Sequence, residues 1–193
     1  MRTTTLVATL AAFAIPTTVV GAIAVNQAAG TLEGMGITPT HDFPVTASSF
    51  DIAISDPDAK GFRTIEVQVP VEAIDTNNGG RNSHMRGTIF DGYKEAGKSL
   101  VVFQARTDST LTAGPVTLDG RLTIVGQARP ITVTATISGT DPLHAKGAAT
   151  INLDEWGIST PGFGPMKVNP QVTMGFDVEL PAPGATAELS LAE

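Results

Sequence analysis

The feature of this sequence that most constrains its fold is a set of segments in which apolar and polar residues alternate. Alternation with period two is typical of a strand that turns one face to a core and the other to water. The segments that show it are 50–54, 63–71, 116–124, 131–137, 149–153 and 172–180. Strands buried on both faces of a parallel sheet would instead read as continuous apolar runs. The sequence therefore predicts an all-β fold, a closed antiparallel barrel or a sandwich around a common apolar interior.

Turn-forming residues separate these segments. Residues 56–58 (Asp-Pro-Asp) divide two of them, and residues 126–130 are expected to join two strands as a hairpin loop. Two stretches lack strand alternation. Residues 81–91 are expected to form a short helix or a lid-like loop, and residues 156–170 a long loop.

The two ends of the chain differ from its middle. Arg2 is followed by an uncharged run over residues 6–25, and Ala22 and Ala24 fit the small-residue pattern of a cleavage site. We expect residues 1–24 to be a secretory signal peptide and the protein to be secreted or periplasmic. Because about 20 apolar residues can also span a bilayer, an uncleaved envelope anchor is the alternative. Residues 181–193 show no strand pattern and are expected to be a flexible tail, which leaves one domain over residues 25–180.

Composition excludes several classes of function. The chain has no cysteine, which excludes disulfides, a thiolate nucleophile and Cys-ligated metals. A net charge of −7, from 12 basic and 19 acidic residues, argues against a nucleic-acid partner. No nucleophile elbow, phosphate-binding loop or zinc-binding helix motif occurs. His41, His84 and His144 lie far apart without metal-ligand spacing, so we predict no metal, no cofactor and no enzymatic activity.

The apolar stripes and one basic cluster are the remaining functional candidates. A closed barrel of about eight strands has an interior that is either packed or holds one small ligand. The stripes are rich in small apolar residues, which suit an elongated pocket and a packed core alike, so both readings stay open. The cluster of Arg81, His84 and Arg86 could contact an anionic or polar head group. It could equally form a structural network with loop carbonyls, Asp75 or Asp91.

Several short motifs follow one another in the middle of the chain. They are Ile74-Asp75-Thr76, then Arg81, His84, Met85 and Arg86, then Phe90-Asp91, then Gly120, Leu122, Thr123, Ile124, Gly126, Pro130 and Ile131. In order and spacing they resemble the YceI-like family of secreted bacterial lipid-binding proteins, over roughly residues 31–180. Asn82 departs from the family, which usually has Asp there. The aromatic first strand usual in the family is hard to find in residues 26–50.

The resemblance implies a fold and a ligand class. The fold is a lipocalin-like antiparallel β-barrel of about eight strands with a short helical or lid segment. We expect it to bind or carry an amphiphilic lipid (isoprenoid, quinone-like or fatty chain) without chemistry on it. The alternative is a solid-core structural or interaction module of the envelope without a ligand, and a second copy of the chain is a candidate partner.

Two sets of residues are expected to form the site. The predicted pocket lining is Val67, Val69, Phe103, Leu118, Leu122, Ile124, Val133, Met174 and Phe176. The predicted mouth or lid is Asp75, Thr76, Arg81, His84 and Arg86.

Overall fold

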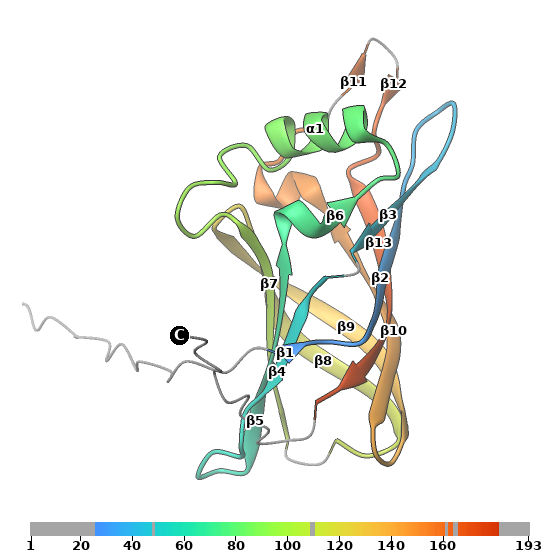
Figure 1. Ribbon diagram of the computed structural model, residues 1–193. Coiled ribbons are helices and arrows are strands. Elements are labelled where there is room, and N and C mark those ends of the chain that lie inside the picture. The colour runs from blue at the N-terminus through green and yellow to red at the C-terminus, as the bar shows by residue number, and fades with distance from the viewer. Residues whose placement is uncertain (1–25, 48, 109–110, 161, 164–165, 182–193) are drawn as a thin grey trace, which may run out of the picture.

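A computed structural model describes residues 26–181, apart from residues 48, 109–110, 161 and 164–165. The predicted signal segment and all but the first residue of the predicted tail lie outside the described residues. The described chain forms an antiparallel β-barrel with a helix across one end (Figure 1). The predicted antiparallel β-barrel is thereby confirmed, and the segment predicted as a short helix or a lid contains a helix. In the described part, no helix has the length and apolar character needed to cross a membrane.

The barrel is built from eleven strands in one sheet, with a separate two-stranded hairpin. The sheet strands are β1 Asn26–Gln27, β2 Gly30–Gly36, β3 Phe43–Ala47, β4 Asp51–Ile54, β5 Phe62–Pro70, β6 Ile74–Asp75, β7 Leu100–Asp108, β8 Gly114–Ile124, β9 Gln127–Gly139, β10 Leu143–Asn152 and β13 Gln171–Leu180. The hairpin of β11 Gly162–Phe163 and β12 Met166–Lys167 lies within the stretch predicted as a long loop.

The pairing of the strands closes on itself. β1 and β2 are two pieces of the segment 26–36, and they pair with β4 and with β13 respectively. β3 and β4 are likewise pieces of one segment, in which β3 pairs with β2 and β4 pairs with β5. With β5 and β6 also counted together, the barrel has about eight strands, as predicted.

Side chains sort between the interior and the solvent along each strand. In β9, Val133 and Ile137 are buried, whereas Thr132, Thr134 and Thr136 are exposed. Two clusters of buried apolar residues result. The cluster at the capped end comprises Val71, Met85, Phe90, Ile124, Leu153, Trp156 and Ile158. The second cluster, on β4, β5, β10 and β13 and the residue before β4, comprises Phe50, Ile52, Ile54, Ile65, Ala145 and Val178.

The cap consists of one α-helix and two 3-10 turns. Helix α1 spans Gly79–Thr88, and the Asn78 side chain caps it by accepting a hydrogen bond from the Arg81 backbone N–H. The turns are η1 (Val71–Ala73), which leads from β5 to β6, and η2 (Leu153–Trp156), which follows β10. Met85 and Phe90 bury their side chains under this cap.

Several boundaries of the predicted strands were wrong; Phe50 precedes β4, and Val71 belongs to η1. The loop predicted over 126–130 is a two-residue turn, because Val125 and Gly126 both adopt positive φ (49° and 75°) and Ile124 pairs with Gln127. Residues 128–130 therefore belong to β9. The segment predicted to end at Leu153 stops at Asn152, whose side chain accepts from the Asp154 N–H and begins η2.

Candidate functional site

The interior of the barrel contains a cavity of about 760 Å³. Protein cores are close-packed and hold few voids larger than a water molecule, so this interior is not a packed core. Ligand sites typically measure about 300–1,000 Å³. All nine residues predicted to line a pocket lie on its wall, namely Val67, Val69, Phe103, Leu118, Leu122, Ile124, Val133, Met174 and Phe176.

Glycines on the wall make room for the larger lining side chains. A Cβ added to Gly34 would lie 2.3 Å from Met174 Sδ, and one added to Gly36 would lie 2.2 Å from the Phe43 ring. Real Cβ atoms do not approach other heavy atoms so closely. The absence of a side chain at these two positions therefore leaves the space that Met174 and Phe43 occupy.

Three of the five predicted mouth residues reach the cavity. Thr76, Arg81 and His84 line it, whereas Asp75 and Arg86 do not. Arg86 instead donates from Nη2 to the carbonyls of Glu72 (2.8 Å) and Ile74 (3.3 Å) and so ties α1 to the η1–β6 segment.

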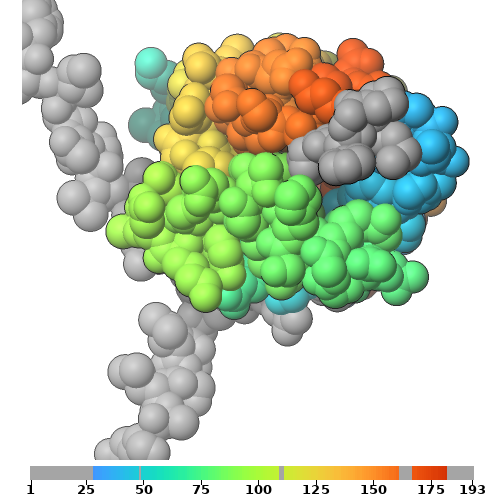
Figure 2. All heavy atoms as spheres, turned by 90° about the horizontal axis from the view of Figure 1, so that it is seen from above, coloured from blue at the N-terminus to red at the C-terminus, as the bar shows by residue number. Residues whose placement is uncertain are grey.

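The opposite side of the mouth comes from residues that the sequence did not single out as site residues. Thr38 and His41, in the loop between β2 and β3, line the cavity together with Phe43. Viewed from the capped end, α1 (green) lies beside this loop (blue) and the η2 region (orange) (Figure 2). The Arg81 guanidinium lies over the Phe43 ring, 4.1 Å from its centroid. The four polar residues Thr38, His41, Arg81 and His84 are called the mouth cluster below.

A hydrogen-bond network holds the start of α1 against β6. Thr76, only 1% exposed, donates to Asn82 Oδ1 from its hydroxyl (2.6 Å) and its N–H (2.8 Å). Asn82 Nδ2 donates to Asp75 Oδ1 (2.7 Å). This donor, followed by the Asn77 N–H, holds the pKa of Asp75 below its ordinary value. Asn82, the departure from the family pattern, thus supplies a donor that an Asp would lack.

We predict that Asn82→Asp destabilises the cap at neutral pH. The substitution places a second carboxylate against Asp75, where like charges repel and one pKa rises. The melting temperature at pH 7 should fall by several degrees, and the difference from the wild type should shrink as acid protonates the pair. Wild-type Asp75, with its lowered pKa, stabilises the fold above about pH 3.8 and loses that contribution as the pH falls below this value.

A suitable control is Asn169→Asp, because the Asn169 side chain only accepts a hydrogen bond, from the Gln171 N–H at 2.9 Å. This variant adds the same charge and should melt within about a degree of the wild type. A pH-independent loss of stability in Asn82→Asp would contradict the carboxylate pairing.

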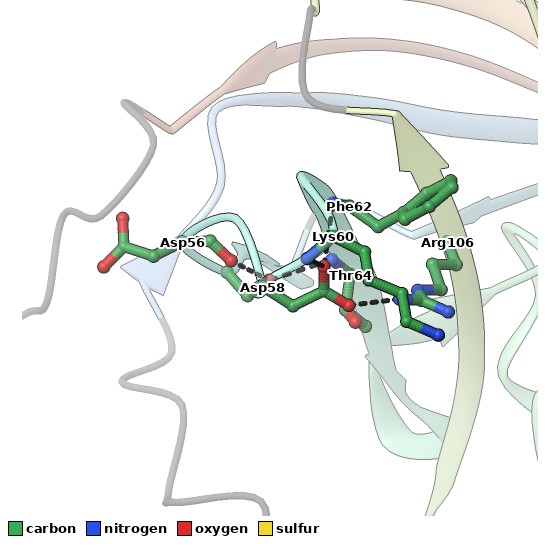
Figure 3. A network of polar contacts seen from close by, with 7 residues as sticks. Asp56, Asp58, Lys60, Phe62, Thr64 and Arg106 are labelled. Atoms are coloured by element: carbon green, nitrogen blue, oxygen red, sulfur yellow. Dashed lines mark hydrogen bonds and ion pairs between the residues drawn. The ribbon is translucent and has the colours of Figure 1, made fainter.

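Another polar network lies at the β4–β5 turn and plays no part in the cavity lining (Figure 3). Asp58 accepts from the N–H groups of Phe62 (3.0 Å) and Lys60 (2.8 Å) and pairs with Arg106. The Phe62 N–H is the main cause of the lowered pKa of Asp58. Arg106 also lies over the Phe62 ring, 4.4 Å from its centroid. These contacts stabilise the turn between β4 and β5.

The described residues contain no group of three or more His, Cys, Asp or Glu arranged to hold a metal ion. His144, on β10, lies 3.9 Å from Glu179 on the neighbouring strand and does not line the cavity. His41 and His84 line the mouth, where neither pairs with a carboxylate in the described part of the chain. The cavity wall is mainly apolar, and the mouth cluster adds polar side chains to it.

Comparison with known proteins accords with this geometry. The model of the YceI-like domain matches residues 24–180. The chain belongs to the YceI-like family. The resemblance seen in its motifs is thereby confirmed. A search of curated proteins found no match.

Solved structures show the same fold at low sequence identity. BcnA of Burkholderia cenocepacia is 14% identical with a TM-score of 0.63, over 79% of this chain and 96% of that one. A polyisoprenoid-binding domain from Saccharophagus degradans is 14% identical with a TM-score of 0.61, over 83% and 99%. A mutant YceI protein of Campylobacter jejuni is 18% identical with a TM-score of 0.53, over 70% and 82%. At these identities the likeness of this YceI-like chain to them establishes the barrel fold.

Proposed function

We propose that this YceI-like protein binds one amphiphilic lipid with a long apolar chain, such as an isoprenoid, and carries it without changing it chemically. The observation that carries the proposal is the apolar cavity of about 760 Å³ inside the barrel. The structural likeness to a domain described as polyisoprenoid-binding supports the same ligand class.

The apolar wall makes chain length the main source of affinity. Each buried methylene gains about 0.8 kcal/mol, so a chain of about 15 carbons gains about 12 kcal/mol. Association itself costs about 4–15 kcal/mol in lost freedom and ordering. Micromolar affinity needs a net gain of about 8 kcal/mol. The ligand must therefore have a long chain and bury most of it.

The competing function is a solid-core structural or interaction module. Such a module needs no internal space, and empty apolar space reduces stability, by about 24 cal/mol per Å³ for the small cavities that core truncations leave. A chain that retains so large an apolar cavity is better explained by an occupant. The cavity therefore favours the carrier.

We further propose that residues 1–24 direct export, which places the carrier outside the cytoplasm. The run of uncharged residues after Arg2 and the small residues at positions 22 and 24 support this proposal. The intact mass of the protein isolated from its own cells shows whether residues 1–24 have been removed. A mass lower by residues 1–24 supports cleavage, and the full-length mass in the envelope fraction would support the anchor instead.

Native mass spectrometry of the protein from its own source tests ligand carriage. The spectrum should show a bound amphiphile of one-to-one stoichiometry, and delipidated protein should take up a prenyl chain. A matched pair of variants on β9 locates the binding. Ala135 lines the cavity, and its neighbour Thr136 is exposed. Ala135→Phe should weaken uptake about tenfold or more, since the ring occupies space that the chain needs. Thr136→Phe should leave uptake within about twofold.

Both variants keep Trp156 as the single tryptophan, so its fluorescence verifies that each is folded. Delipidated protein that takes up no prenyl or fatty chain would overturn the proposal and favour the solid module. Equal uptake by the two variants would place the ligand outside the barrel.

A further inference from the structure

Resting on the proposed function, we propose that the cavity selects lipids with an anionic, oxygen-bearing head group, a carboxylate or a phosphate, which Arg81 binds at the mouth. The proposal concerns the polar end of the ligand, on which the apolar wall has no bearing. It rests on the hydrogen-bond donors of Arg81 that no described residue accepts from.

Arg81 keeps a donor unused at the edge of the cavity. Its Nη2 donates to the Thr76 carbonyl at 2.8 Å, and its guanidinium plane lies on the Phe43 ring. Its Nε is buried without a hydrogen-bond partner among the described residues, and its Nη1 makes no hydrogen bond to them either but is not buried. Because Arg81 lines the cavity, a ligand can reach Nη1 and supply the acceptor that it lacks.

The positive charge of Arg81 is also unpaired. Arg81 makes no ion pair with a carboxylate in the described part of the chain. The described lining contains no Asp or Glu. An unpaired cation beside an apolar space is costly, and an anionic oxygen that completes the guanidinium fork relieves that cost with a charge-assisted hydrogen bond.

The other basic residue of the cap serves a different purpose. Arg86 also has a buried Nε without a described partner, but it does not line the cavity, and its Nη2 holds the Glu72 and Ile74 carbonyls. Arg86 braces the cap, and Arg81 faces the ligand. The remaining members of the mouth cluster add hydroxyl and imidazole groups around Arg81. The same mouth offers no acceptor charge for a cationic head group.

Head-group selection is tested with ligands that share one chain. Oleate, oleyl alcohol and oleylamine differ only at the head, and farnesyl phosphate paired with farnesol repeats the comparison for a phosphate on an isoprenoid chain. Delipidated wild-type protein at pH 8 should bind oleate and farnesyl phosphate about tenfold more tightly than the matching alcohols. Oleylamine should bind more weakly than the alcohol. The two anions show which of the two head groups the site prefers.

Variants then assign the preference to Arg81. Arg81→Gln should bring the acid-to-alcohol ratio to about one while the alcohols still bind, and Arg81→Lys should keep part of the ratio because it keeps the charge. Arg121→Gln is the matched control, since Arg121 is exposed on β8 and does not line the cavity. It should leave the ratio unchanged. The ratio is measured within each variant, so a small loss of stability does not affect it.

The outcomes separate this inference from the proposed function. Equal binding of acids and alcohols by the wild type overturns head-group selection and leaves the apolar carrier standing. Arg81→Gln that weakens all ligands equally would show that Arg81 only positions the cap, and it overturns the inference too. Failure of every chain to bind overturns the proposed function itself.

Discussion

Replacing Gly147 by alanine should lower the free energy of unfolding by about 3 kcal/mol, the upper end of overpacking costs. Gly147 lies on β10, where a Cβ would come within 2.1 Å of the Thr134 carbonyl oxygen and 2.7 Å of the Ala135 Cα. Both atoms are backbone of the paired strand β9, so they yield only if the two strands separate. The same Cβ would lie 2.7 Å from Phe176 Cζ, which lines the cavity. The substitution should therefore both lower the stability of the fold and change the shape of the cavity.

Gly175 provides the matched control on the neighbouring strand β13, where it is paired with Ala148. The nearest atoms to a Cβ there are the Glu33 and Gly147 carbonyl oxygens, at 3.7 and 3.8 Å. Gly175→Ala should be neutral or stabilising by about 0.4–1 kcal/mol, because alanine restricts the unfolded chain. Urea unfolding followed by the fluorescence of Trp156 measures both variants. Equal losses of stability in the two would contradict the argument from backbone contact.

The strands that could be predicted from sequence are those in which apolar side chains on one face alternate with polar side chains on the other. Over 131–137 and 172–180, apolar and polar residues alternate without interruption, and the structure has strands β9 and β13 there. Inward positions on such strands necessarily border the interior. Eight of the nine predicted lining residues come from such alternating segments and Phe103 does not, and all nine lie on the cavity wall.

Strand β2 could not be predicted, for a physical reason. β2 has glycine at 30, 34 and 36, so most of its inward positions carry no apolar side chain to produce alternation. Those at 34 and 36 are glycine because Met174 and Phe43 from neighbouring strands occupy the space. A local pattern cannot show a requirement that other strands impose. Because β2 was not predicted, the loop that follows it was not recognised as part of the mouth, and Thr38 and His41 were missed.

The basic cluster illustrates what sequence leaves undecided about a site. Arg81 and Arg86 are five positions apart on one short helix, and both head-group contact and a structural network were open for them. Their roles separate only because η1 turns the Glu72 carbonyl toward Arg86, while β3 brings Phe43 beneath Arg81. Neither neighbour is close in sequence to the arginine that it contacts. The segment could thus be predicted as a helix or a lid, but the different roles of its two arginines could not.

The second large effect is expected for Phe50→Ala, which should cost about 3–5 kcal/mol. Phe50 is 1% exposed and belongs to the cluster with Ile52, Ile65 and Val178, three residues that also line the cavity. For a domain of this size, such a loss lowers the melting temperature by about 6–20 °C. Phe50 packs in the same cluster as these wall residues but does not itself line the cavity. A saturating lipid should therefore still bind and restore about 2.7 kcal/mol at a concentration 100 times its Kd.

Phe62→Ala is the comparison that makes this expectation specific to burial. Phe62 is 38% exposed, and its ring contacts the Arg106 guanidinium at the surface, a contact worth about 0.5–1 kcal/mol. The same truncation there should cost about 1 kcal/mol, and a lipid should raise the melting temperatures of this variant and the wild type equally. Thermal unfolding with and without lipid measures, for each variant, the loss of stability and the stabilisation by lipid. If Phe50→Ala lost its response to lipid while staying folded, the wall would depend on Phe50 for its shape, and the separation of core support from ligand contact would be wrong.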